Sequence, residues 1–175
     1  SQNKGYADKL TSHWAANKGH KNVATKSSKP RLDATVSASA NTEGKHRPET
    51  LVDGNYGTKY YHGSPTFPAS FVFSLKGSSM TATTYTIVSG NDMPERDPKS
   101  WELWGSNDGK NWTSLDKRTG EKFTSRLQAR DFKVATGQAF SKYKLVVTES
   151  VKKSSGLQFA EVHLDTKPAA SKDEY

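Results

Sequence analysis

The feature that most constrains the fold of this chain is a series of short runs with strand character, separated by turn residues. Residues 70–75 form the clearest run, because Phe71, Phe73 and Leu75 alternate with Ser and Val. Such alternation places one face of a strand against a core and the other face toward solvent. Further runs of strand character lie at 83–90, 100–106, 111–118, 129–135, 140–149 and 157–165.

No long stretch with the 3.6-residue period of an amphipathic helix separates these runs. The pattern therefore favours an antiparallel fold over one in which helices and strands alternate. We expect an all-β chain built as an antiparallel β-sandwich of the jelly-roll kind. The length of 175 residues fits one domain of this kind.

The two ends of the chain differ in composition from the middle. Residues 1–31 are rich in Lys, Asn, Ser and Gly, and residues 167–175 combine Pro, Ala and charged residues without periodicity. We expect a polar N-terminal extension or linker over 1–31, a folded domain over 32–166 and a C-terminal linker over 167–175. An alternative for the N-terminal segment is a short helix over 6–14, where Tyr, Leu and Trp recur four residues apart.

The net charge of +8 favours acidic partners, such as anionic polysaccharide, nucleic acid or anionic lipid. The basic residues are scattered, however, so the charge also fits a Lys-rich surface that only keeps the protein in solution. The chain has no cysteine, which leaves packing or a metal bound through oxygen to stabilise the fold. No apolar run approaches the roughly 20 residues of a membrane span, and we expect no stable membrane insertion.

Residues 92–112, DMPERDPKSWELWGSNDGKNW, combine turn residues, charges and tryptophans. The second half of this segment predicts a β-hairpin, because Asp108 and Gly109 lie between two runs of strand character and Gly tolerates positive φ. Trp101 and Leu103 fall on one face of the first run. The tryptophans of the hairpin are expected to pack in the core or across strands rather than to contact a ligand.

A second informative stretch is TLVDGNYGTKYYHG, residues 50–63. Asp53, Asn55 and Thr58 place three oxygen-bearing side chains within six residues, and two glycines allow the backbone to curl around a common centre. Oxygen ligands suit a hard cation such as Ca²⁺, although the spacing differs from that of an EF-hand loop. The alternative is a turn that the Asx side chains stabilise without a metal.

Taken together, these motifs resemble the discoidin, or coagulation-factor type C, superfamily, and more narrowly the family 32 carbohydrate-binding modules of bacterial secreted glycan-active enzymes. The resemblance covers about residues 32–165. It is carried by GSNDG with Trp112 three residues later, by DGN at 53–55 and by LQFAEV at 157–162. It implies a discoidin-like, non-catalytic sandwich that binds sugars through loops at one end. The lack of cysteine favours the bacterial branch, because eukaryotic discoidin domains usually carry a disulfide.

The resemblance also implies two sets of site residues. Those matching a structural Ca²⁺ site are the carbonyls of Thr50 and Ala160 together with Asp53, Asn55, Thr58 and Glu161. Those in the loops that would bind a glycan are Tyr61, His62, Phe67, Asn91, Asp92, Arg96 and Gln158. Such a site needs an aromatic or apolar platform and a few fixed polar groups.

Two of these positions have alternative roles. Arg96 would instead belong to the scaffold if it paired with Asp92 or Asp97. Tyr60 lies where relatives have a buried aromatic residue, so we expect Tyr60 in the core and Tyr61 on the opposite side of the chain.

The expected function is a non-catalytic module that binds a glycan and targets a covalently linked enzyme, such as a glycoside hydrolase or polysaccharide lyase, to its substrate. We expect a monomer, secreted or at the cell surface, with a structural Ca²⁺ and no nucleic acid partner. Intrinsic catalysis is not expected, because Ser, His and Asp do not form a nucleophile motif. Two alternatives remain open. One is an adhesion or membrane-surface module that uses residues 60–68, and the other is a general binder of polyanions.

Overall fold

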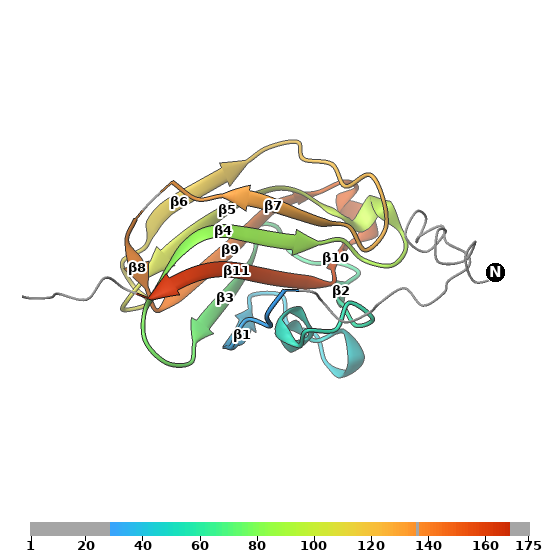
Figure 1. Ribbon diagram of the computed structural model, residues 1–175. Helices are drawn as coiled ribbons and strands as arrows, with labels where there is room; N and C mark the ends of the chain where they lie inside the picture. Colours follow the sequence, from blue (N-terminus) through green and yellow to red (C-terminus); the bar gives the residue numbers. More distant parts are fainter. Residues whose placement is uncertain (1–28, 136, 169–175) are drawn as a thin grey trace, which may run out of the picture.

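The computed structural model describes residues 29–135 and 137–168, which form two antiparallel sheets packed face to face (Figure 1). Within these ranges the regular elements are strands and short 3-10 helices, without an α-helix. This confirms the all-β sandwich predicted from the alternating runs. No described helix has the length and apolar character needed to cross a membrane. The short helix considered for 6–14 lies outside the described residues.

The larger sheet has five strands in the order β1-β3-β9-β5-β6, and each neighbouring pair is antiparallel. Its strands are β1 (Ala34–Ala38), β3 (Ala69–Leu75), β5 (Pro98–Ser106), β6 (Thr113–Arg118) and β9 (Lys142–Ser150). The second sheet has the order β11-β4-β7, and β8 pairs with the start of β4. Its strands are β4 (Met80–Val88), β7 (Ala129–Lys133), β8 (Ala139–Phe140) and β11 (Glu161–Pro168).

The core lies between the two sheets and follows the predicted alternation. Phe71 and Phe73 of β3 are buried. Trp101 of β5 is only 1% exposed, and its indole N–H donates a hydrogen bond of 2.8 Å to the hydroxyl of Tyr85 on β4. Trp101 therefore connects the two sheets through the core. Trp104 and Trp112 lie outside the core, where Lys144 Nζ lies 4.2 Å from the centroid of the Trp112 ring.

The hairpin between β5 and β6 contains the predicted turn. Gly109 has φ of +76°, in the left-handed region that glycine adopts without strain. Backbone N–H groups of Asn111 and Lys110 donate to Asp108, and these bonds hold the pKa of the Asp108 carboxyl well below its usual range. The hairpin lies at the end of the sandwich opposite to η3, because β5 runs from η3 to this turn.

A two-stranded pair and four short helices gather at the other end of the sandwich (Figure 1). They are β2 (Tyr60–His62), β10 (Leu157–Phe159), η1 (Gly44–His46), η2 (Pro48–Val52), η3 (Pro94–Arg96) and η4 (Lys153–Ser155). The sequence pattern did not predict β1 or β2. It also treated 157–165 as one strand, whereas the chain breaks at Ala160, whose N–H donates to the carbonyl of Val88.

Candidate functional site

The two adjacent tyrosines of β2 point to opposite sides, as expected. Tyr60 is 0% exposed, and its hydroxyl donates a hydrogen bond of 2.7 Å to the carbonyl of Ala40, so burial raises its pKa. Tyr61 is half-buried and faces a hollow of about 440 Å³. We call this hollow the Tyr61 site. It is lined by Lys45, His46, Gly57, Thr58, Lys59, Tyr61, Asn91, Asp92 and Arg96.

Three side chains hold the ring of Tyr61 in place. The guanidinium carbon of Arg96 lies 4.3 Å from the ring centroid, and Lys59 Nζ lies 5.9 Å from it. The imidazole of His46 meets the ring edge-on, with centroids 5.6 Å apart and an interplanar angle of 84°. The Tyr61 ring is thus surrounded by cationic groups and an imidazole, which gives the site both an aromatic and a charged character.

The polar side of the site comes from the loop before η3. Lys59 Nζ donates to Asn91 Oδ1 at 2.9 Å and to Asp92 Oδ1 at 2.8 Å. Burial opposes ionisation of Asp92, but hydrogen bonds from Lys59 and Gln158 outweigh it and lower the pKa of Asp92. Asp92 therefore remains a carboxylate within a fixed network.

Burial is the main cause that lowers the pKa of His46, and the positive charges of Lys59 and Lys45 lower it further. His46 is thus neutral near pH 7. The positive charge around His46 therefore comes from Lys45 and Lys59 rather than from the imidazole.

Gln158 lies behind this loop rather than in the hollow. Its side chain is fully buried, and Nε2 donates to the backbone carbonyl of Asp92 and to Asp92 Oδ1. A Cβ atom added at Gly90 would lie only 2.7 Å from the same Nε2, so a larger residue there would displace the Gln158 side chain. We interpret Gln158 as a positioning residue for Asp92.

Asp97, which directly follows η3, forms a buried ion pair with Arg126 that anchors this helix. The carboxylate of Asp97 accepts hydrogen bonds from both terminal nitrogens of Arg126, one of them at 2.8 Å, and both side chains are buried. Arg126 also donates to the carbonyl of Asp92 at 3.3 Å. An ion pair between Arg96 and Asp97, one of the two alternatives from the sequence, is wrong because Arg126 pairs with Asp97 instead. The other alternative, Asp92, is ion-paired with Lys59, and Arg96 acts on it through its charge.

The remaining predicted glycan ligands lie apart from the Tyr61 site. His62 lines a separate hollow of about 380 Å³, and its Nδ1 accepts a hydrogen bond from the Ser64 N–H. Phe67 is half-buried against the core, with Lys153 Nζ 5.4 Å from its ring centroid. Of the predicted residues, the structure therefore brings together Tyr61, Asn91, Asp92 and Arg96.

Three residues that line the Tyr61 site were not predicted from the sequence: Lys45, His46 and Lys59. The period of a strand would have found Lys59, because it precedes Tyr61 by two positions and lies on the same side. Lys45 and His46 belong to η1, whose surrounding sequence has no periodic pattern.

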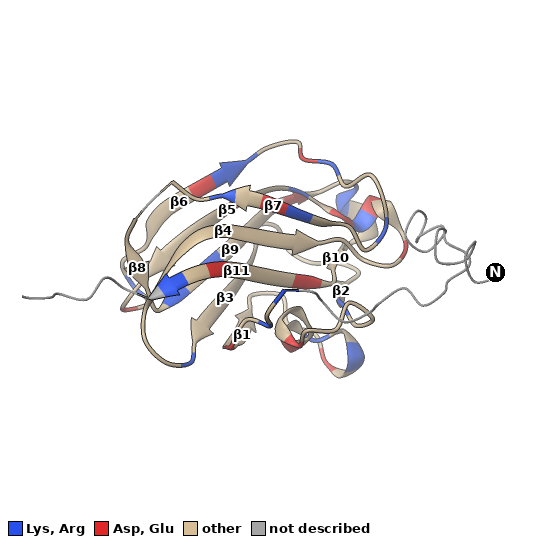
Figure 2. Ribbon diagram, viewed as in Figure 1, with Lys and Arg blue, Asp and Glu red and all other residues tan. Residues whose placement is uncertain are grey.

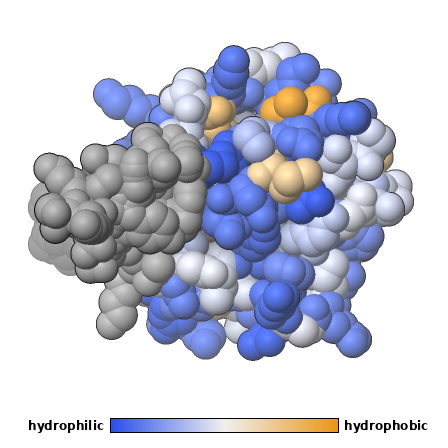
Figure 3. All heavy atoms as spheres, turned by 90° about the vertical axis from the view of Figure 1, so that its right-hand side faces the viewer, coloured by the Kyte–Doolittle hydropathy of each residue, from blue (hydrophilic) through white to orange (hydrophobic). Residues whose placement is uncertain are grey.

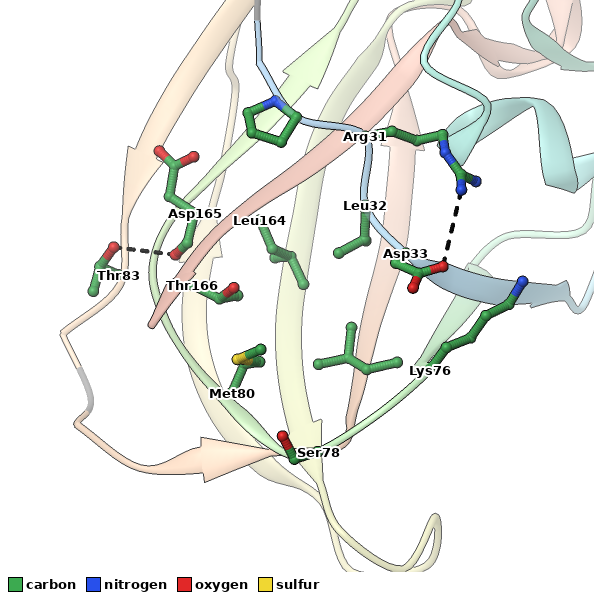
Figure 4. A pocket seen from close by; sticks show the side chains of 12 residues that line it. Arg31, Leu32, Asp33, Lys76, Ser78, Met80, Thr83, Leu164, Asp165 and Thr166 are labelled. Atoms are coloured by element: carbon green, nitrogen blue, oxygen red, sulfur yellow. Dashed lines mark hydrogen bonds and ion pairs between the residues drawn. The ribbon is translucent and has the colours of Figure 1, made fainter. Parts of the chain in front are cut away.

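A further hollow of about 420 Å³ opens between the sheets near the start of β1 (Figure 4). Leu32, Met80 and Leu164 contribute apolar side chains to it. Among its polar groups, Arg31 pairs with Asp33 at 3.9 Å. None of the predicted site residues lines this hollow.

Of the predicted Ca²⁺ ligands, Asp53, Asn55 and Thr58 lie in the loop after η2, which contacts Glu161 at the start of β11. The Thr50 carbonyl accepts a hydrogen bond from the Asp53 N–H. Glu161 is 0% exposed, and its Oε2 accepts a hydrogen bond of 2.7 Å from the Gly54 N–H. Its other oxygen, Oε1, is buried without a hydrogen-bond partner among the described residues. Burial, together with the charge of Asp53, raises the pKa of Glu161 to about 9. A buried carboxylate beside a second one is the arrangement that a bound cation would stabilise.

The same loop also shows the turn that was considered as the alternative. Asp53 Oδ1 accepts from the Asn55 N–H at 2.9 Å, and Asn55 Oδ1 accepts from the Gly57 N–H at 2.8 Å. Thr58 donates its hydroxyl to Asp53 Oδ2. Over the described ranges, no group of three or more His, Cys, Asp or Glu residues could hold a metal. A cation here would thus bind two carboxylates and neutral oxygens, which suits Ca²⁺ rather than zinc.

Residues 34–157 match the F5/8 type C domain. A peptide-N(4)-(N-acetyl-beta-glucosaminyl)asparagine amidase of Arabidopsis thaliana is 40% identical over 84 residues, which are 46% of this chain and 12% of that protein. The chain thus spans a small part of the length of this relative.

Several solved structures share the fold. CpGH89CBM32-5 of Clostridium perfringens, in complex with GalNAc-beta-1,3-galactose, has a TM-score of 0.67 and 18% identity over 77% of this chain and 96% of its own. The family 32 module of NanJ from the same species, in complex with galactose, has a TM-score of 0.65 and 20% identity over 77% and 95%. Chitosan-binding module 1 from Paenibacillus sp. IK-5 has a TM-score of 0.64 and 19% identity over 77% and 96%. At these identities the likeness concerns the fold.

Proposed function

The chain belongs to the F5/8 type C domain family, and on that premise we propose that it is a non-catalytic domain that binds a glycan in the Tyr61 site. One observation carries the proposal. The guanidinium of Arg96 is held 4.3 Å from the ring centroid of Tyr61, beside the network of Lys59, Asn91 and Asp92.

This arrangement suits a sugar for a physical reason. Sugar hydroxyls need hydrogen-bond donors and acceptors at fixed positions, and an aromatic ring offers contact to the C–H groups of the pyranose. Arg96 and Lys59 supply donors, and Asn91 supplies amide donors and an acceptor. Because these groups are already held by contacts within the protein, binding costs little further ordering of side chains.

The surface around the Tyr61 site supports a glycan rather than a lipid bilayer as partner. Figure 3 shows the end of the sandwich that carries the loops, and the visible described part of this face is mostly hydrophilic, with small apolar patches. The large apolar side chains exposed within 29–135 and 137–168 are Met93 and Val151. Membrane-surface binding requires a more extended apolar face.

We also propose that the domain serves a larger secreted, glycan-active protein, which it brings to its substrate. The matched relative is an amidase whose name refers to N-acetyl-beta-glucosaminyl asparagine, and this chain matches 12% of its length. Other structures of the same fold come from enzymes named as chitobiases. A bacterial origin stays a prediction, because the curated relative is a plant protein.

A structural Ca²⁺ ion is the second part of the proposal. The carboxylates of Asp53 and Glu161 would hold it, together with oxygens of Thr50, Asn55, Thr58 and Ala160. The ion would supply the positive charge that allows the buried Glu161 to ionise. It would thereby join the loop after η2 to β11, which already pack against each other.

A glycan array followed by calorimetric titration of the best ligand tests the proposed function. We expect the intact chain to bind a defined set of glycans, and Tyr61→Ala to lose most of that affinity while it remains folded. Absence of binding to any glycan would overturn the proposal. Normal binding by Tyr61→Ala would move the site away from this hollow.

A further inference from the structure

We infer that the Tyr61 site selects sugars that carry an anionic group, either a carboxylate or a sulfate ester. The inference rests on the proposed function and concerns the same site. It specifies the class of glycan, which family membership leaves open.

The balance of charge in the site is the first argument. Lys45, Lys59 and Arg96 line the hollow, and Asp92 is the only carboxylate among its lining residues. Lys59 and Asp92 form an ion pair with an N–O distance of 2.8 Å, and the Lys59 side chain is only 14% exposed. These two charges largely compensate each other, so Lys45 and Arg96 remain as the cations that a ligand would meet.

The second argument is that the charge of Arg96 is less compensated than that of Lys59. It acts on Asp92, but that carboxylate is already ion-paired with Lys59. No ion pair of Arg96 occurs within the described ranges, and its Nε is buried without a hydrogen-bond partner there. The adjacent carboxylate, Asp97, is held by Arg126 instead. A guanidinium fixed in this way offers paired N–H donors to a carboxylate or sulfate, for which its planar geometry is well suited.

The third argument comes from the effect of the lysines on their surroundings. The positive charges of Lys59 and Lys45 both act on His46, which packs edge-on against Tyr61. Asp92 acts on His46 in the opposite sense, but three cationic side chains against one carboxylate leave the lining with an excess of positive charge. Figure 2 shows Lys and Arg residues on the helices at this end, interspersed with acidic ones, and the chain as a whole carries +8. Such a field attracts an anionic ligand and repels a protonated amino sugar.

The experiment compares sugars that differ only in charge. An array presents each hexose as the neutral sugar, the uronate and the 6-sulfate, and calorimetry then measures the best acidic ligand and its neutral parent. The titrations are repeated at about 0.1 M and about 1 M NaCl, between which the Debye length falls from about 10 Å to about 3 Å. We expect the acidic form to bind roughly tenfold or more tightly than its neutral parent at low salt. This preference should decrease at high salt.

Three variants test whether the preference for an acidic sugar depends on the Tyr61 site. Arg96→Gln and Lys45→Gln should each reduce the ratio of acidic to neutral affinity, and Lys45 is exposed, so its change should not affect folding. Lys110→Gln removes the same charge from the hairpin at the opposite end of the sandwich and should leave the ratio unchanged. A melting curve of each variant confirms that it is folded.

The outcomes are distinguishable. Equal affinity for a sugar and its uronate or sulfate would overturn this inference and leave the proposed function in place. Failure to bind any sugar would overturn both. Binding of phosphatidylserine vesicles that depends on Arg96, without binding of acidic sugars, would overturn both in favour of a lipid headgroup.

Discussion

The guanidinium of Arg96, on η3, lies 4.3 Å from the ring centroid of Tyr61, on β2. This contact joins two short elements that come from different parts of the chain. It brings the polar segment before η3 next to the aromatic strand β2. The Tyr61 site therefore exists only once the sandwich has assembled.

Adjacent tyrosines on β2 provide a matched pair of substitutions. We expect Tyr61→Ala to weaken glycan binding about tenfold or more and to cost only about 1 kcal/mol in the free energy of unfolding, because the ring is half-buried and its cation–π contacts are weak. We expect Tyr60→Ala to cost about 3–5 kcal/mol, because its ring is fully buried. Denaturant unfolding and calorimetry measure the two effects. Similar losses of stability in both variants would show that Tyr61 is part of the core.

A variant of Gln158 distinguishes two roles for this residue, holding Asp92 in position or contacting the glycan directly. Gln158→Ala removes the hydrogen bonds that hold the carbonyl and carboxylate of Asp92. We therefore expect weaker binding and faster exchange of the Arg96 and Asp97 amides, which donate to the carbonyls of Met93 and Pro94. Unchanged exchange together with lost binding would argue instead that Gln158 touches the ligand, as the family resemblance implied. Ser154→Ala, an exposed change on η4, serves as the control.

The buried pair of Asp97 and Arg126 should stabilise η3 and hence the loop of the Tyr61 site. Arg126→Met leaves the Asp97 carboxylate buried without its partner, and we expect a loss of about 3–5 kcal/mol in the free energy of unfolding. The double variant Asp97→Leu with Arg126→Met should recover much of this loss, because no unpaired charge remains. Denaturant unfolding of the single and double variants measures the coupling. Additive losses would contradict a direct interaction between the two side chains.

Much of the sandwich could be predicted because its signals are local. The alternation in β3 and the Asp-Gly turn after β5 depend only on neighbouring residues, and both were confirmed. β2 was missed because it has three residues and is stabilised by pairing with β10, far away in the sequence. The pairing of Asp97 with Arg126 was missed for the same reason, since it joins residues 29 positions apart. Contacts of this kind depend on how the loops fold against each other, which local periodicity does not encode.

The last prediction concerns Ca²⁺. A ligand that binds only the folded state stabilises it by mass action, and at a free concentration of about 100 times Kd the gain is about 2.7 kcal/mol. For a domain of this size we expect a chelator to lower Tm by about 5–10 °C.

Glu161→Gln keeps the shape of the side chain and removes its charge. Burial and the Asp53 charge raise the pKa of Glu161 to about 9, so without a cation this residue is protonated at pH 7 and resembles glutamine. The variant should therefore melt near the temperature of the chelated chain, with or without Ca²⁺. Glu43→Gln, an exposed residue before η1, should keep the full response to Ca²⁺. If the chelator leaves Tm unchanged and elemental analysis finds no metal, the loop after η2 is held by its Asx hydrogen bonds alone, and the Ca²⁺ proposal is wrong.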